Sequence, residues 1–152
     1  MSYQTINADF QRHVAYATSL LRISLGVMFL AHSVILKHFT YTLSGTAGYF
    51  ESIGLPAELA YVVFWIETLA GIALVLGIGT RIATIAVLPV LLGAFWVHLG
   101  NGWVFSATGG GWEYPLYLIV LTVAQFLLGP GAFALRLGGY SANQPENDRV
   151  TA

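Results

Sequence analysis

Four long apolar segments, each separated from the next by a short polar or glycine-rich stretch, constrain this chain more than any other feature. They cover residues 16–38, 60–78, 82–99 and 112–128. A helix that spans a bilayer needs about 20 predominantly apolar residues. Only 9% of the residues are charged, whereas a soluble domain carries about 25%. The sequence therefore predicts an all-α membrane protein, a four-transmembrane-helix bundle formed by residues 16–135.

The placement of the basic residues predicts which way this bundle faces. If there are four spans, most of the Lys and Arg side chains fall on one side of the membrane: Arg12, Arg22, Arg81, Arg136 and Arg149. Lys37 falls on the other side. Because cytoplasmic loops carry an excess of Lys and Arg, we expect both termini in the cytoplasm, with residues 1–15 and 136–152 as tails, the second of them flexible. We expect Arg22 to act as an anchor whose side chain extends to the cytoplasmic surface.

Several function classes lack support in the sequence. The chain has no cysteine, which excludes a disulfide framework, a CxxC redox site and thiolate metal sites within it. A dinucleotide-binding GxGxxG after a strand, a P-loop and a GxSxG motif are also missing. The net charge of −1 gives no electrostatic reason to expect nucleic-acid binding. We expect no metal site, because the histidines and glutamates show no recognised ligand spacing.

Five titratable side chains fall at similar depths in the outer half of the predicted bundle. An ionisable group at the centre of a membrane helix costs about 2.5–3.5 kcal/mol, so each such group is a functional hypothesis. With a rise of about 1.5 Å per residue, two of the five lie at nearly the same depth and the others lie nearer the outer rim. The candidate ligand-binding or proton-exchange residues are His32, Glu67, Lys37, His98 and Glu113.

Each of these residues also has a purely structural explanation. Glu67 can pair with a histidine or a backbone donor to fix the packing of the helices. Lys37 can extend to the interface, His98 and Glu113 can be solvated there, and the aromatic residues can form an interfacial belt. Gly26, Gly71 and Gly93 are expected to allow helices to approach closely. The coincidence of depth across four helices favours a functional cluster.

The ordered motifs of the chain resemble the DoxX family of bacterial four-helix membrane proteins. The resemblance rests on Leu20–Ser33, on Tyr49–Thr84 with its GLP and its glycine-rich turn before Arg81, and on Gly109–Leu135 with its LLGPG. It implies a bacterial inner-membrane bundle with a redox association. Relatives include a subunit of an archaeal thiosulfate:quinone oxidoreductase, and others are linked to oxidative-stress complexes or quinone resistance. Many members have no assigned activity.

The polar residues of the family fall on His32, Glu67 and Glu113, but one position departs from the family pattern. Members often show His-Gly with a lysine soon after, whereas here Ser33 replaces the glycine and Lys37 comes one position late. On an α-helix one extra residue turns a side chain by about 100°, away from the direction of the family's lysine.

Three hypotheses for function follow. The first is an accessory protein of redox or oxidative-stress processes that binds a quinone or a similar small aromatic ligand, with electrons supplied by a soluble or membrane redox partner. This hypothesis favours a non-catalytic subunit over an enzyme. The second is a membrane assembly or anchor subunit for a redox complex. The third is a small transporter, which with four helices per chain would need a homo-oligomer.

Overall fold

The computed structural model describes residues 3–135, and all of its described secondary structure is helical. Tail residues 136–152, and with them Arg136 and Arg149, lie outside the described residues. The elements in chain order are α1 (Tyr3–Leu30), the π-helix η1 (Ala31–Thr40), α2 (Leu43–Ser52), α3 (Glu58–Leu76), α4 (Thr80–His98), the short 3₁₀-helix η2 (Leu99–Asn101) and α5 (Glu113–Leu128).

Three of these helical segments are long and apolar enough to cross a membrane: residues 7–40, 58–76 and 80–101. Helix α5 is apolar but shorter, with 16 residues. Large aliphatic side chains point outward on several helices, for example Leu20, Ile82 and Leu127, which are 70%, 75% and 70% exposed. Apolar faces of this kind suit lipid rather than water. The prediction of an all-helical membrane protein is therefore confirmed.

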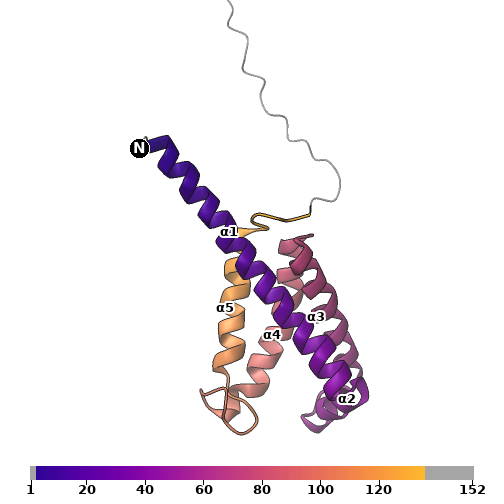
Figure 1. The fold of residues 1–152 in the computed structure, drawn as a ribbon. Helices are drawn as coiled ribbons and strands as arrows, with labels where there is room; N and C mark the ends of the chain where they lie inside the picture. The colour runs from indigo at the N-terminus through magenta and orange to yellow at the C-terminus, as the bar shows by residue number, and fades with distance from the viewer. Residues whose placement is uncertain (1–2, 136–152) are drawn as a thin grey trace, which may run out of the picture.

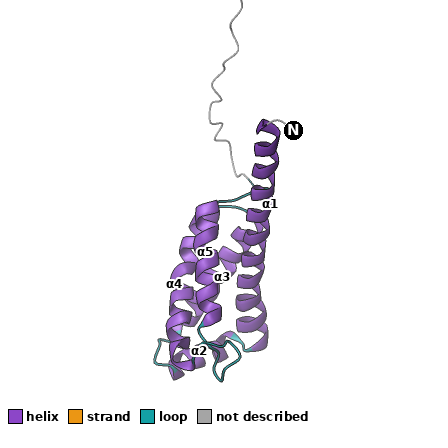
Figure 2. Ribbon diagram, turned by 90° about the vertical axis from the view of Figure 1, so that its left-hand side faces the viewer, coloured by secondary structure: helices purple, strands orange, loops and turns teal. Residues whose placement is uncertain are grey.

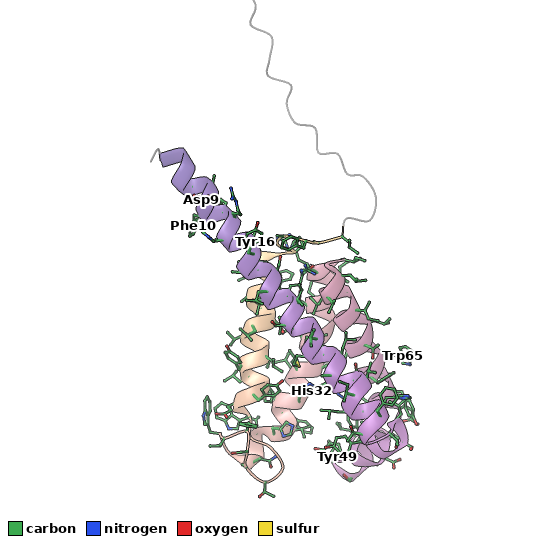
Figure 3. The ribbon with its side chains drawn as sticks, viewed as in Figure 1. Asp9, Phe10, Tyr16, His32, Tyr49 and Trp65 are labelled. Carbon is green, nitrogen blue, oxygen red and sulfur yellow. The ribbon has the colours of Figure 1, made fainter. Side chains whose placement is uncertain are left out.

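Helix α1 continues without interruption into η1, so that residues 7–40 form a single rod of 34 residues. At about 1.5 Å per residue the rod is about 50 Å long, more than the roughly 30 Å hydrocarbon core of a bilayer. The first turns of α1 project beyond the other helices (Figures 1 and 2). Figure 3 shows Asp9 and Phe10 on this projecting part. The helix begins at Tyr3, well before residue 16, where the first apolar segment starts.

Helices α1 and α3 pack closely because two glycines face each other. A Cβ atom built on Gly26 would lie 2.8 Å from the carbonyl oxygen of Gly71, and one built on Gly71 would lie 3.0 Å from the oxygen of Gly26. The predicted close approach is confirmed at both positions. It is wrong for Gly93, where an added Cβ would meet no atom within 4 Å. The core beside this contact includes Leu25, Phe29 and Leu74.

The expectation that Arg22 extends to the membrane surface is wrong, because its side chain is fully buried. Its Nε donates to Pro130 O at 2.9 Å and its Nη2 to Ala132 O at 3.3 Å. Its Nη1 donates to Leu74 O at 2.5 Å and to Val75 O at 3.0 Å. The last carbonyls of a helix have no partner within that helix. Arg22 satisfies two of them at the end of α3 and ties the segment after α5 to the bundle.

The two ends of the bundle differ in structure. At one end, Gly77 and Gly79 adopt left-handed backbone conformations, with φ of 78° and 55°, and form the predicted tight turn between α3 and α4. Helix α2 and the loop between η2 and α5 lie together at the opposite end (Figures 1 and 2). That end contains the candidate site.

Candidate functional site

A cavity of about 870 Å³ opens at the α2 end of the bundle. Its walls come from the end of α1, from η1 and from α2, α3, α4 and α5, and most of the lining side chains are apolar or aromatic. Small-molecule sites in proteins typically enclose about 300–1,000 Å³ and carry a few polar groups in an apolar lining. Four of the five predicted site residues line this cavity: His32, Lys37, Glu67 and His98.

An ion pair joins η1 to α3 on the wall of the cavity. The Nζ of Lys37 donates to Oε2 of Glu67 at 2.6 Å. The side chain of Lys37 is 17% exposed and that of Glu67 is 8% exposed. Each charge therefore has its counter-charge at hydrogen-bond distance, which is what a low-dielectric interior requires of buried charges. The pair also leaves a donor group and an acceptor group beside the cavity.

The π-helix explains why Lys37 reaches Glu67. A π-helix bonds each N–H to the carbonyl five residues back, and the bond from Tyr41 N to Leu36 O at 2.8 Å continues this pattern at its end. Residues five positions apart then lie about one turn apart on the same side. His32 and Lys37 have that spacing, so both face the cavity. The wider turn compensates for the one-position offset of Lys37 from the family spacing.

His32 lines the same cavity as this ion pair, in the half of the molecule that also contains Tyr49 (Figure 3). Its Nδ1 is 3.0 Å from the carbonyl oxygen of Met28. Because a carbonyl can only accept, this hydrogen bond requires the proton on Nδ1. In the neutral ring this leaves Nε2 as an acceptor for a ligand or a proton. The imidazole ring also stacks against Tyr114, with ring centroids 5.9 Å apart.

His98 lines the same cavity, but one of its nitrogens holds a loop. Its Nδ1 lies 3.0 Å from Gly109 O and 3.1 Å from Gly110 O. The Nδ2 of Asn101 donates to the same two oxygens, both at 2.9 Å. The two side chains together fix the glycine-rich loop that closes this end of the bundle.

Glu113 does not join the other four residues. It lines a smaller hollow of about 380 Å³ beside α5, which shares Phe105 and Tyr114 with the lining of the large cavity. Its Oε1 accepts from the backbone N–H of Phe105 at 3.0 Å. Glu113 begins α5 at the same end of the bundle as the cavity, but it does not line that cavity.

The site also contains aromatic residues that were not predicted as part of it. Tyr41, Tyr49 and Phe50 line the cavity from η1's end and from α2, and Tyr114 lines it from α5. The signal that could have placed α2 in the site is its lack of charged residues apart from Glu51, which suits a helix that covers a cavity.

Within residues 3–135 no group of three or more His, Cys, Asp or Glu side chains lies in an arrangement that could hold a metal ion. The polar groups of the cavity are instead the Lys37–Glu67 ion pair, the imidazoles of His32 and His98, the hydroxyl of Thr46 and the phenol groups of nearby tyrosines. This set can form hydrogen bonds to a ligand and can exchange protons with it.

Comparison with known proteins gives a consistent result. A family model described as DoxX matches residues 17–100. A protein of Bacillus subtilis (strain 168), named "Putative oxidoreductase CatD", is 39% identical over 136 residues, which make up 89% of this chain and 94% of that protein. No solved structure matches the chain.

Proposed function

The chain belongs to the DoxX family, and on this premise we propose that it binds a quinone, or a similar small aromatic molecule, in the cavity at the α2 end. The binding would support redox or oxidative-stress processes. The observation that carries the proposal is the Lys37–Glu67 ion pair, which lies with His32 on the wall of an otherwise mainly apolar cavity. The name of the Bacillus relative, an oxidoreductase, supports a redox context.

The proposal includes a membrane topology. The protein would be a multi-pass protein of the bacterial inner membrane, with four spans, both termini in the cytoplasm and the cavity in the outer half. Helix α5, about 24 Å long at 1.5 Å per residue, would be the fourth span. Its contacts with α4 and the Arg22 bonds to the segment after it support a place inside the bundle. The charge bias of the Lys and Arg residues supports the orientation.

The residues of the cavity suit the chemistry of a quinone. Reduction of a quinone to a quinol takes up two electrons and two protons at its two oxygens. The Nε2 of His32 and the carboxylate of Glu67 would exchange these protons with the ligand, and Lys37 would hold Glu67 in position. The aromatic side chains, Tyr114 among them, would pack against the ring.

The electrons would come from outside the chain. The sequence has no cysteine and shows no flavin or haem motif, so its own residues offer no obvious electron carrier. A soluble or membrane redox partner would supply the electrons. The protein would then be an accessory subunit of an oxidoreductase system rather than the enzyme itself.

The test is ligand-dependent thermal stabilisation. Purified protein in a maltoside detergent is heated with and without menadione, a short quinone, and the unfolding midpoint is measured. We expect the midpoint of the wild-type protein to rise with quinone concentration and the rise to be lost in Glu67→Gln. Glu58→Gln is the matched control, because Glu58 begins the same helix but is exposed and lies outside the cavity lining. Equal stabilisation of the wild type and Glu67→Gln, or none in the wild type, would contradict the proposal.

A further inference from the structure

The smaller hollow beside α5 has a composition that the proposed quinone site does not explain. Four of its lining residues are aromatic, and one is a carboxylate. The lining consists of Trp103, Phe105, Glu113, Tyr114, Leu116, Tyr117 and Val120. We call it the aromatic hollow. It opens on the outer surface of the bundle, whereas the large cavity lies among the helices.

The wall of the aromatic hollow is held in place by backbone hydrogen bonds. The loop before α5 folds back on itself, so that Trp112 N donates to Gly102 O and Glu113 N donates to Trp103 O, both at 3.1 Å. The Phe105 N–H donates to the carboxylate of Glu113. These bonds fix two of the aromatic residues next to the first turn of α5.

Glycine at position 111 is required for this arrangement. A Cβ atom there would collide with the carbonyl oxygens of Trp103 and Val104. Gly111 is buried, and the chain passes so close to itself only because it has no side chain. The aromatic hollow is therefore built into the loop and does not depend on a ligand to order it.

The carboxylate in the hollow has capacity for a cation. Residues 3–135 contain two ion pairs, Asp9–Arg12 and Lys37–Glu67. Glu113 belongs to neither of them. Its Oε1 accepts from Phe105, and Oε2 makes no hydrogen bond within the described part of the chain. A negative charge with a free oxygen thus lies among aromatic rings.

Those rings are largely uncovered. Trp103 is 54% exposed, Phe105 is 64% exposed and Tyr117 is 61% exposed. The face of an aromatic ring attracts a cation, and organic ammonium groups are the ligands most often recognised by aromatic walls. An interfacial aromatic belt would account for the rings, but it would not require a carboxylate between them or a rigid loop to hold them.

We propose that the aromatic hollow binds an organic ammonium group, with Glu113 as the counter-charge and Trp103, Phe105 and Tyr117 as the aromatic wall. A hard metal cation fits less well, because Ca²⁺ and Mg²⁺ take six or more oxygen ligands and the hollow offers one carboxylate. The ammonium group can belong to a lipid headgroup, such as that of phosphatidylethanolamine, or to a free amine. Both share the chemistry that the hollow recognises.

The test uses intrinsic tryptophan fluorescence of the full chain in a maltoside detergent, which carries no ammonium group. Tetramethylammonium chloride is titrated against sodium chloride at equal ionic strength. We expect a saturable change with tetramethylammonium only, and its loss in Trp103→Phe. Glu113→Gln keeps an oxygen for the Phe105 N–H but removes the charge, and it should weaken the apparent affinity by about tenfold or more.

Two further variants keep the proposal open to refutation if Glu113→Gln folds poorly. Tyr117→Leu removes one exposed ring and should weaken binding by about threefold, in line with a single cation–π contact. Glu58→Gln removes an exposed carboxylate elsewhere and should leave the titration unchanged. An equal response to sodium and tetramethylammonium, or unchanged affinity in both Glu113→Gln and Tyr117→Leu, would overturn the proposal.

A second arm distinguishes the two sources of the ammonium group. The wild-type protein is placed in nanodiscs of phosphatidylglycerol alone or of phosphatidylglycerol with phosphatidylethanolamine. If the headgroup is the ligand, phosphatidylethanolamine will compete and suppress the response to tetramethylammonium. If a free amine is the ligand, the response will be the same in both membranes. If tetramethylammonium causes no response in either membrane, the result would contradict binding of an ammonium group.

Discussion

The Nζ of Lys37 lies 2.6 Å from Oε2 of Glu67, and this contact joins the π-helix η1 to α3 across the wall of the large cavity. Both side chains are mostly buried. Burying either charge alone would be costly, and together they neutralise each other. The contact therefore contributes both to the geometry of the candidate site and to the stability of the bundle. Its effect on ligand binding can be separated from its effect on stability only by comparing variants.

Removing one partner of this ion pair should destabilise the protein strongly. Glu67→Gln leaves the ammonium of Lys37 without a counter-charge, and the expected cost is about 3 kcal/mol or more. The double variant Lys37→Met, Glu67→Leu should recover most of the loss, because it buries no charge. The measurement is thermal unfolding in detergent, followed by circular dichroism.

The exposed pair Asp9–Arg12 provides the control for that experiment. Its side chains are 52% and 63% exposed, at a separation of 3.7 Å. Arg12→Met should therefore change stability by no more than about 1 kcal/mol. A double variant at Lys37 and Glu67 that is no more stable than Glu67→Gln would show that the charges are not what matters at this position.

The π-helix predicts an unusual tolerance to deletion. Removing Ile35, an exposed residue inside η1, should convert the segment to α-helix and keep His32 and Lys37 on one side, since they would then be four residues apart. Val27 is an exposed residue in the α-helical part of the rod. Removing it should rotate the part of α1 that contains Gly26 relative to the residues after position 27, so that Gly26 no longer faces Gly71. The two residues are similarly exposed, at 57% and 54%.

The check is the folded yield and the unfolding midpoint of the two deletion variants. We expect the Ile35 deletion to fold and to retain quinone-dependent stabilisation, and the Val27 deletion to lose both. If the two deletions are equally harmful, the π-helix does not set the register of Lys37.

The sequence alone predicted the helical elements, the glycine turn and the close contact at Gly26, because each depends on local composition and spacing. It also predicted that His32 and Glu67 share a depth. Depth follows from counting residues along a helix. The rotation of each helix about its own axis does not follow from such counting, and so Glu113, which begins α5 at the cavity end of the bundle, lines a different hollow.

Two features were not predicted. The extra residue before Lys37 was interpreted on an α-helix, where it turns the side chain by about 100°, and not as the wider turn of the π-helix at Ala31–Thr40. The partners of Arg22 are backbone carbonyls between 52 and 110 positions away in the chain. Backbone carbonyls are the same at every residue, and a sequence does not show which of them lack a partner.

The contact between α1 and α3 should not accept a methyl group. In Gly26→Ala the new Cβ would lie 2.8 Å from Gly71 O and from a side-chain carbon of Val75. Overpacking of this kind costs about 1–3 kcal/mol, so the unfolding midpoint should fall. Gly48→Ala in α2 is the matched control. Nothing lies within 4 Å of its added Cβ, and replacing a helical glycine should stabilise slightly. A lowered midpoint in both variants would point to a general sensitivity to glycine replacement.

The last prediction concerns Arg22, which ties the segment after α5 to α1 and α3. Arg22→Lys keeps the charge but replaces a planar group with five N–H donors by a single ammonium with three. Four carbonyls then compete for it, and at least one hydrogen bond to a charged donor should be lost, at about 1.5–3 kcal/mol. Arg81→Lys is the control, because Arg81 is exposed and donates one bond, to Phe126 O.

The readout is hydrogen exchange at two backbone amides that close the same end of the bundle. Ala132 N donates to Ala15 O, and Leu135 N donates to Leu76 O. Both amides lie in the segment that Arg22 holds, so Arg22→Lys should speed their exchange without affecting amides in η1. Arg81→Lys should leave them protected. If exchange at Ala132 and Leu135 is unchanged in Arg22→Lys, the segment is held by its own backbone bonds and packing. Arg22 then contributes only its hydrogen bonds to the last carbonyls of α3.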